Sequence, residues 1–594
     1  MTASYRTAVR FLFLAIMGLA SITLRAQAPA KSSSSSKAST YIYNVMGYGD
    51  TTVCRVYSCG GQQMIRNIDP RQTPDKHYVA NYVFEVDYVD RATDSVYYLL
   101  DCTDGKYYTS WTLSNSNLQW DTQVVDKNIT RYITHINSNR MEFEMSSQYG
   151  EDVTPLLSYG NLPGVLVRFT RNGNVTMELE EVKKGKADKK SPSVIPSNMG
   201  KRMTSREISN LKKQKLVLTQ RIFDNDQIHW GANTDHNEAV WKRNGLEGSH
   251  ERFPKDTTIH FAGGTLILKR VNFGMLPNHY QLFAELHQQS NGDAYDRTGS
   301  IFVIPTSKAH TFFEGIAFNP DSLPILYSKN GERFQGVVST DNYDVPVELV
   351  RFFTPFGVNH FNSRVQLDGL EWEDEAYYKQ EITDLAALLQ EDVWIGAFIG
   401  NYDGGGHKVT LDIKAYPGAE TWEEKDLEKP VILPLFNTCN VLEMAGQNYG
   451  KIFGTDSIKV TVTIPETVNG RAVKRIRLRY ISTGHGGWGG GDEFNPKENE
   501  IFVDGKKRFT HTPWRGDCGT FRKFNPVSGN FWNGISSSDY SRSGWCPGTA
   551  TQPVYFDLTG LPAGKHTISV AIPMGEDEGG SFSHWCVSGV LIVE

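Results

Sequence analysis

The sequence lacks the motifs that mark zinc enzymes and serine hydrolases. Its histidines are scattered and form no H-E-x-x-H motif, and its 7 cysteines include no C-x-x-C pair. These absences argue against both catalytic and structural zinc sites. The G-x-S-x-G pattern is also missing, which removes the simplest serine-hydrolase mechanism. We therefore expect chemistry carried by carboxylates, with no metal and no other cofactor.

The sequence also lacks a net positive charge and long apolar runs. The net charge of -6 provides no basic field, so nucleic acid is not an expected partner. No segment beyond the N-terminus approaches the roughly 20 apolar residues of a membrane span, so we expect no membrane insertion of the mature chain. The N-terminus itself predicts a cleaved signal peptide and export to the periplasm or the exterior. Its features are Arg6 and Arg10, the apolar run from Phe11 to Ala20, and the small residues Ala26 and Ala28.

Short runs of alternating apolar and polar residues dominate the rest of the chain. Residues 82–88 and 408–413 are examples, and turn residues separate such runs. This pattern is typical of β-strands. One helix-length segment, 382–390, interrupts it. The sequence therefore predicts an all-β protein, whose last two units are antiparallel sandwiches or jelly rolls.

Composition shifts divide the chain into seven segments. They are a signal peptide (1–28), a Ser-rich flexible leader (29–40), a β-rich N-terminal accessory domain (41–182), a Lys-rich linker (183–224), a first jelly roll (225–417), an acidic connector (418–430) and a second jelly roll (431–594).

Three short segments carry groups suited to chemistry. In the first, Asp296 and Arg297 precede an apolar run, where a loop-to-strand junction would hold a carboxylate rigidly. The alternative is a turn aspartate with a surface ion pair, which is the commoner arrangement. In the second, His485, Trp488 and Glu493 are interspersed with glycines that permit close backbone approach. The alternative there is a mobile loop with a solvated glutamate.

The third segment begins at Arg542 and reads R-S-G-W-C-P-G. It places an arginine and Trp545 beside a cysteine that export would allow to form a disulfide. Structural anchoring of the chain is an equally plausible role for these residues.

Together, the three segments resemble the peptide-N-glycosidase F family of bacterial glycoamidases, over about residues 225–594. The Arg542 segment is the most specific part. The resemblance implies two adjacent antiparallel jelly rolls with the site at their interface, and N-glycoproteins or N-glycopeptides as substrates. It also implies roles for individual residues. Asp296 would activate water, Glu493 would bind and polarise the substrate, Arg297, Arg542, His485, Trp488 and Trp545 would contact or support it, and Cys518 would pair with Cys546.

Two departures from the family pattern bear on specificity. The best-known branch has a third site glutamate in a strand whose counterpart here is 392–398, and this segment contains no glutamate. Asp403 lies shortly after it. A smaller or less charged wall could admit a core α1,3-fucose. The N-terminal unit, which shorter members lack, resembles the bowl-like extra domain of the longer branch.

Other functions remain open from the residues alone. A glycan-binding protein without catalysis could use exposed Trp and Tyr on β-sandwiches. A glycoside hydrolase could use Asp296 and Glu493 to cut between sugars, and would leave a GlcNAc on the asparagine. A copper monooxygenase is the weakest alternative, because the sequence lacks clustered histidines.

Overall fold

The computed structural model describes residues 38–46, 51–68, 82–102, 104–113, 118–185, 195–231, 253, 255–273, 280–318, 320–390, 392–417, 429–439, 448–486, 491–575 and 583–594. The predicted signal peptide lies outside these residues, as do most of the predicted leader and most of the acidic connector. No helix in the described part of the chain is both long and apolar enough to cross a membrane. The chain divides into two compact units, with the boundary between Leu218 and Thr219.

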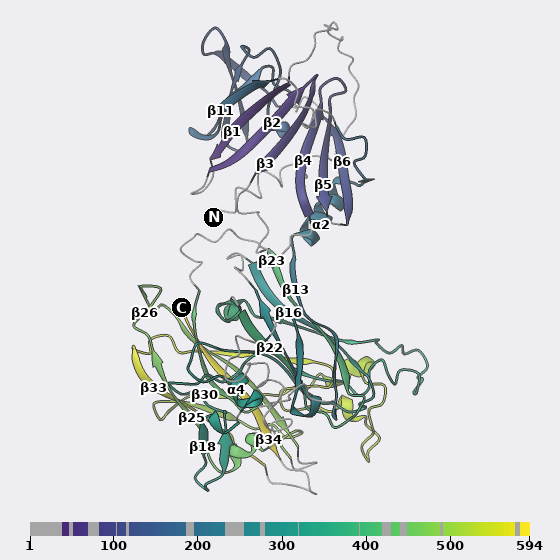
Figure 1. The fold of residues 1–594 in the computed structure, drawn as a ribbon, viewed down its shortest axis with the longest axis vertical. Coiled ribbons are helices and arrows are strands. Elements are labelled where there is room, and N and C mark those ends of the chain that lie inside the picture. Colours follow the sequence, from purple (N-terminus) through teal and green to yellow (C-terminus); the bar gives the residue numbers. More distant parts are fainter. Residues whose placement is uncertain are drawn as a thin grey trace. The chain divides into compact units, whose positions relative to one another are not determined.

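The N-terminal unit is built on a sheet of 12 strands. They are β1 (Ala38–Met46), β2 (Thr51–Cys59), β3 (Gln62–Ile68), β4 (Tyr82–Asp90), β5 (Ser95–Cys102), β6 (Gly105–Thr112), β7 (Asp121–Val124), β8 (Ile129–Ile136), β9 (Asn139–Ser146), β10 (Val165–Arg171), β11 (Asn174–Gly185) and β12 (Lys201–Arg202). The spatial order is β12-β6-β5-β4-β3-β2-β1-β11-β10-β9-β8-β7. Figure 1 shows β1 to β6 as a curved surface. A short 3-10 helix, η2 (Leu157–Tyr159), precedes β10.

A helix lies where a linker is predicted. α2 (Ser205–Lys215) begins with a capping box, in which the Thr204 hydroxyl accepts a bond from the Glu207 N–H and the Glu207 carboxylate accepts one from the Thr204 N–H. Ile208 packs against Leu100 and Cys102 of the N-terminal sheet. The 183–224 segment therefore contains ordered structure that belongs to the N-terminal unit. The sequence did not reveal this helix, because its single buried residue gives little apolar periodicity.

The first jelly roll pairs two sheets. Their strands are β13 (Leu218–Ile228), β14 (Thr258–Phe261), β15 (Leu266–Asn272), β16 (Tyr280–Ser290), β17 (Thr298–Ile304), β20 (Val347–Phe353), β21 (Ala376–Glu381), β22 (Asp392–Ile399), β23 (His407–Pro417) and β31 (Ala550–Thr551). The sheet orders are β13-β23-β16-β21 and β14-β15-β22-β17-β20-β31. The smaller elements are β18 (Ile325–Tyr327), β19 (Arg333–Gln335), α4 (Phe312–Ala317), η4 (Ala262–Gly264), η5 (Pro320–Ser322) and η6 (Thr383–Leu388). The helix-length segment expected at 382–390 is thus the 3-10 helix η6.

The second jelly roll has two four-stranded sheets, in the orders β24-β34-β28-β32 and β25-β33-β29-β30. Its strands are β24 (Val431–Asn437), β25 (Ile458–Ile464), β26 (Thr467–Val468), β27 (Arg471–Ala472), β28 (Ile476–His485), β29 (Asn499–Val503), β30 (Lys506–His511), β32 (Val554–Asp557), β33 (Gly564–Ala571) and β34 (His584–Val593). The 3-10 helices are η9 (Tyr449–Gly454), η10 (Cys518–Phe524) and η11 (Ser537–Asp539). The prediction of an all-β fold with two adjacent antiparallel jelly rolls after a β-rich domain is confirmed.

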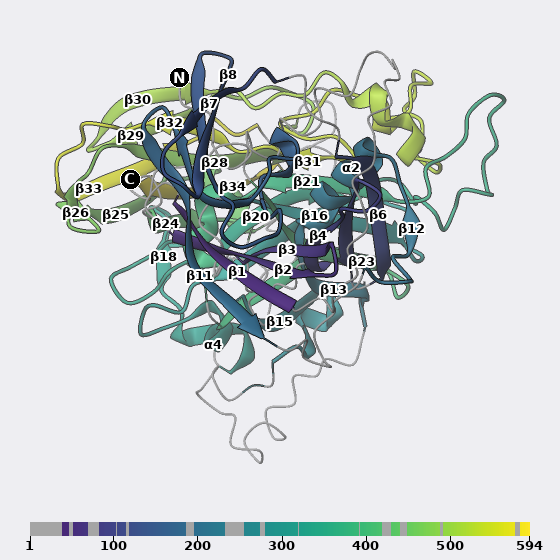
Figure 2. The same ribbon diagram turned by 90° about the horizontal axis from the view of Figure 1, so that it is seen from above.

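The two jelly rolls meet along β20. Every residue of β20 is buried, and the late segment β31 pairs with it through Arg351 opposite Thr551 and Phe352 opposite Ala550. Figure 2 shows β31 beside β20, with β28 and β34 of the second jelly roll close by. A strand covered on both faces reads as a nearly continuous apolar run, which fits the sequence V-E-L-V-R-F-F.

A buried ion pair lies at this junction. Glu348 accepts two bonds from Arg351, at 2.7 Å from Nε and 2.5 Å from Nη2. It also accepts bonds from the hydroxyls of Ser300 in β17, at 2.7 Å, and Ser588 in β34, at 2.6 Å. Arg351 in turn donates to the Cys586 carbonyl at 2.9 Å. The network therefore spans both jelly rolls.

Candidate active site

Asp296 lies in the loop that enters β17, where the first jelly roll faces the second. β17 and β20 are antiparallel, with Thr298 opposite Phe353. The start of β17 therefore lies at the end of β20, next to the point where β31 pairs with it. The Asp296 side chain is 17% exposed, so it is neither a solvated turn residue nor fully enclosed.

Arg297 is held by a carboxylate that sequence reasoning did not single out. Asp293, 1% exposed, accepts bonds from Arg297 Nε at 2.7 Å and from Nη2 at 3.2 Å. Burial alone would raise the pKa of Asp293, but His407 and Arg297 outweigh it and lower that pKa to about 2. The pair is thus a buried clamp, in contrast to the surface ion pair weighed as an alternative. In the sequence, only the four-residue spacing between Asp293 and Arg297 could have indicated this ion pair.

Arg542 joins the two candidate catalytic carboxylates. Its side chain is 0% exposed; Nε donates to Glu493 Oε1 at 3.0 Å, and Nη2 lies 3.6 Å from Asp296 Oδ2. Nη1 donates to the carbonyls of Ser537 at 2.7 Å and Tyr540 at 3.0 Å. These backbone contacts fix the guanidinium group. The structure therefore brings Asp296, Glu493 and Arg542 together from segments far apart in the chain.

Backbone contacts pin Glu493 in place at the end of the glycine-rich segment. The Gly486 N–H donates to Glu493 Oε2 at 3.4 Å, and the Glu493 N–H donates to the Gly486 carbonyl at 3.3 Å. Ser543 N–H donates to the Glu493 carbonyl at 2.9 Å, which ties this segment to the one that carries Arg542. Trp488, predicted to contact the substrate, lies outside the described residues.

Electrostatics single out Asp296. Burial, with a contribution from the charge of Glu493, raises the pKa of Asp296 to about 7, although Arg542 and Arg297 oppose the shift. A carboxylate with a pKa close to neutral pH is well suited to accept a proton from water. Perturbed carboxylates of this kind are concentrated at functional sites.

Trp545 and His485 form a stack behind Arg542. The Arg542 guanidinium lies 4.9 Å from the Trp545 ring centroid, and Trp545 stacks on Phe353 at 4.3 Å and packs against His485 at 5.2 Å. Burial, then the nearby His584 and arginines, holds the pKa of His485 well below its ordinary value. His485 is therefore neutral, and it lies beneath Trp545 as a buried support.

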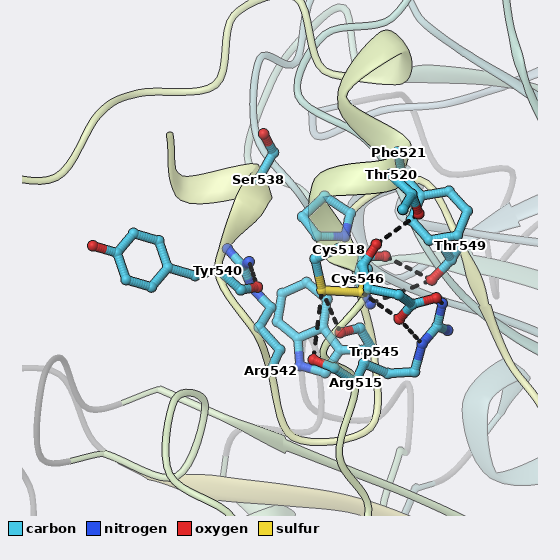
Figure 3. The surroundings of a disulfide bond; sticks show 12 residues. Arg515, Cys518, Thr520, Phe521, Ser538, Tyr540, Arg542, Trp545, Cys546 and Thr549 are labelled. Carbon is cyan, nitrogen blue, oxygen red and sulfur yellow. Dashed lines mark hydrogen bonds and ion pairs between the residues drawn. A yellow bond between two sulfur atoms is a disulfide. The ribbon is translucent and has the colours of Figure 1, made fainter. Parts of the chain in front are cut away.

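A disulfide joins the two loops beside this stack. Cys518 at the start of η10 is bonded to Cys546, which confirms the pairing that the family resemblance implied. Figure 3 shows Trp545 next to the sulfur atoms, and the Arg542 guanidinium lies over the Trp545 ring. The Cys546 carbonyl accepts bonds from the Thr549 N–H at 3.1 Å and from the Thr549 hydroxyl at 2.8 Å, so hydrogen bonds within the loop also close it.

Exposed aromatic rings lie around Arg297. Its guanidinium is 5.1 Å from the ring of Tyr295 and 5.6 Å from that of Tyr402, and Tyr402 is 6.1 Å from Trp230. The exposed fractions are 61% for Tyr295, 53% for Tyr402 and 43% for Trp230. Exposed aromatic faces of this kind suit stacking against sugars. Sequence reasoning missed Trp230 and Tyr402, because lone aromatics between strands resemble core residues.

In the part of the chain that the structure describes, no group of three or more His, Cys, Asp or Glu side chains is arranged to hold a metal ion.

Comparisons with protein families place most of the second unit. The model described as "Peptide-N-glycosidase F, N terminal" matches residues 219–415, and "Peptide-N-glycosidase F, C terminal" matches residues 448–592. Comparison with curated proteins gives no match.

Solved structures extend the likeness to nearly the whole chain. The chain is 35% identical to PNGF-II crystallised in space group C2, with 94% of this chain and 98% of that chain covered and a TM-score of 0.61. The same protein in space group P21 gives a TM-score of 0.62, with 94% and 99% covered. PNGase F, a glycosylasparaginase from Flavobacterium meningosepticum, is 14% identical over 64% of this chain and 96% of that chain, with a TM-score of 0.39.

Proposed function

Because the chain belongs to the peptide-N-glycosidase F family, we propose that it hydrolyses the amide bond between an asparagine side chain and the first GlcNAc of an N-linked glycan. The observation that carries the proposal is the convergence of Asp296 and Glu493 on the buried Arg542. The aromatic rings around Arg297 offer faces on which the sugars of such a substrate would stack. The disulfide of the site supports export to an oxidising compartment.

Asp296 acts as the general base in this mechanism. It takes a proton from a water molecule, whose oxygen forms a bond to the amide carbon. Its pKa of about 7 leaves it ionised above neutral pH yet basic enough to accept the proton. Glu493 accepts a hydrogen bond from the substrate and polarises it. The bond from Arg542 holds the Glu493 carboxylate in orientation.

The positive charge of Arg297 stabilises the oxyanion that develops on the carbonyl oxygen. Asp293 holds Nε and Nη2 of Arg297. Nη1 has no hydrogen-bond partner among the described residues and is the group that donates to the oxyanion. Collapse of the intermediate breaks the carbon–nitrogen bond, and the nitrogen takes up the proton that Asp296 accepted from the water. The products are an aspartate in the peptide and a glycosylamine.

Mass spectrometry of a defined N-glycopeptide tests the proposal. The peptide is incubated with the protein and EDTA in heavy-oxygen water. We expect loss of the whole glycan and an aspartate that carries the heavy oxygen. A peptide that retains one GlcNAc on its asparagine would instead establish a glycoside hydrolase. An unchanged glycopeptide across several glycan types would favour the glycan-binding protein.

We also propose that the enzyme accepts a core α1,3-fucose on the first GlcNAc. β22 carries no glutamate, and the nearby Asp403 is engaged in its own turn, where Oδ1 accepts bonds from the N–H groups of Gly405 at 2.7 Å and Gly406 at 2.9 Å. One oxygen of the Asp403 carboxylate is therefore used within its own turn, which limits how far Asp403 can replace the missing glutamate. Digestion of plant-type glycopeptides should release α1,3-fucosylated glycans, and no release beside normal release of unfucosylated glycans would refute this specificity alone.

A further inference from the structure

We propose that Thr354 is a positioning residue that fixes the backbone of Asp296 relative to Arg542. The inference rests on the proposed function of Asp296 as the base. Thr354 follows the last residue of β20, and its side chain is fully buried at 0% exposed. It was not among the residues selected from the sequence, and it lies too deep to contact a substrate.

The Thr354 side chain brackets Asp296 on both sides. Its hydroxyl accepts a bond from the Arg297 N–H at 2.8 Å and donates one to the Tyr295 carbonyl at 3.1 Å. The Thr354 N–H also donates to the Arg297 carbonyl at 2.9 Å. The peptide groups before and after Asp296 are therefore held by one residue. A loop residue tied on both sides has little freedom to rotate its carboxylate.

Phe353, the residue before Thr354, connects the Asp296 loop to the loop that carries Trp545. The Phe353 N–H donates to the Thr549 carbonyl, and the Gly548 N–H donates to the Phe353 carbonyl, both at 3.0 Å. The Phe353 ring also stacks on Trp545. Phe353 and Thr354 thus hold the loop of Asp296 on one side and the loop of Trp545 on the other. The separation of 3.6 Å between Arg542 and Asp296 depends on these contacts of Phe353 and Thr354.

Thr354→Val and Thr354→Ser separate the hydroxyl from the shape of the side chain. Valine keeps the shape, but it leaves the Arg297 N–H and the Tyr295 carbonyl without their partner. We expect Thr354→Val to lower kcat on a glycopeptide about 10- to 100-fold with little change in KM, because small misplacements of a catalytic group are costly. Thr354→Ser retains the hydroxyl and should remain within about threefold of the wild type.

The pH profile supplies a readout that loss of stability would not move. A loosened loop admits water to Asp296, and burial is the largest cause of its raised pKa. The acid limb of kcat/KM should therefore shift to lower pH in Thr354→Val and stay in place in Thr354→Ser. An unshifted limb with wild-type kcat in a folded Thr354→Val protein would overturn the inference, as would equal defects in both variants.

Thr438→Val is the matched control. Thr438 is also 0% exposed, and its hydroxyl accepts from the Val587 N–H and donates to the Trp585 carbonyl, both at 2.8 Å. It therefore brackets Cys586 as Thr354 brackets Asp296. We expect Thr438→Val to lower the melting temperature while the pH profile remains that of the wild type.

A measurement without turnover keeps the inference separate from the proposed function. The melting-temperature difference between the Asp296 protein and its Asp296→Asn variant, followed against pH, reports the pKa of Asp296. Its midpoint should move when Thr354→Val is added to both proteins, and an unmoved midpoint would refute the positioning role even if the protein proved to have no amidase activity. An inactive Asp296→Asn beside a fully active Thr354→Val would refute the positioning role and leave the proposed function standing.

Discussion

Two buried constellations of carboxylate and arginine lie where the jelly rolls meet, and they differ in how fully the carboxylates are bonded. At the junction, Glu348 accepts four hydrogen bonds, two from Arg351 and two from serine hydroxyls. At the candidate site, Asp296 lies 3.6 Å from Arg542, whose Nε is bonded to Glu493. Both guanidinium groups are 0% exposed.

This difference in bonding shifts the pKa values of the two carboxylates in opposite directions. Burial opposes ionisation of both groups, but Arg351 and the serines outweigh it and keep the pKa of Glu348 below its ordinary value. For Asp296, burial and the charge of Glu493 prevail, and the pKa rises to about 7. A buried carboxylate with all its hydrogen-bond partners therefore stays ionised, whereas one with few partners can exchange a proton near neutral pH.

Removal of the charge at Asp296 should have the largest effect on activity. Asp296→Asn keeps the shape of the side chain but cannot take a proton from water, so we expect kcat to fall about 10²- to 10⁴-fold. Rates of glycan release from a labelled glycopeptide measure this. The melting temperature at pH 8 should not fall, because a carboxylate with a raised pKa costs stability when ionised. A variant with full activity would remove Asp296 from the mechanism.

Removal of the charge at Glu348 should act on stability. Glu348→Gln leaves Arg351 buried without its counter-ion, which costs about 3–5 kcal/mol. Calorimetry of the intact chain measures this as a lower melting temperature. The double variant Glu348→Gln with Arg351→Met should lose less than Glu348→Gln alone, because no charge remains buried. Equal losses would show that the hydroxyl contacts of Glu348, and not the ion pair, stabilise the junction.

The sequence predicted the strand content, the jelly rolls and three segments that the structure brings together, but it could not reveal how either carboxylate is bonded. Glu348 and Arg351 are three residues apart, and alternation along a strand would place them on opposite faces. A register shift leaves Leu349 unpaired between Glu348 and Val350, and such a bulge returns both side chains to one face. The Arg542 contact with Asp296 likewise depends on long-range packing. Trp230, Tyr402 and Thr354 give no local signal in the sequence.

The acid limb of the pH profile should sharpen the contrast between the two groups. Below pH 7, kcat/KM of the wild type should fall about tenfold for each pH unit as Asp296 becomes protonated. Stability should follow the opposite course. The pKa of Asp296 is raised from 3.8 to about 7 in the folded chain, so its contribution to stability is complete below about pH 4 and is lost as pH rises towards 7. Melting curves of the wild type and Asp296→Asn at pH 5 and pH 8 test this. A melting-temperature difference between the two proteins that is equal at both pH values would contradict the raised pKa.

Arg297 allows the smallest and most specific test. Its clamp by Asp293 and its contacts with two aromatic rings suit the planar guanidinium group, which lysine cannot reproduce. Arg297→Lys should therefore raise KM or lower kcat by about 5- to 30-fold, the equivalent of about 1–2 kcal/mol, in steady-state kinetics with a glycopeptide.

Arg515 offers the matched control. Its backbone pairs with that of Arg542, but its side chain makes the same two kinds of contact with residues that the proposed mechanism does not use. Its Nε and Nη2 are bonded to the Asp517 carboxylate at 2.7 and 2.8 Å, and it lies 5.5 Å from the ring of Phe521. Arg515→Lys should stay within about threefold of the wild type. Equal losses in Arg297→Lys and Arg515→Lys would mean that the clamp maintains loop structure only. A loss confined to Arg297→Lys would show that Asp293, a buried carboxylate with its partners, serves function by orienting the Arg297 guanidinium group.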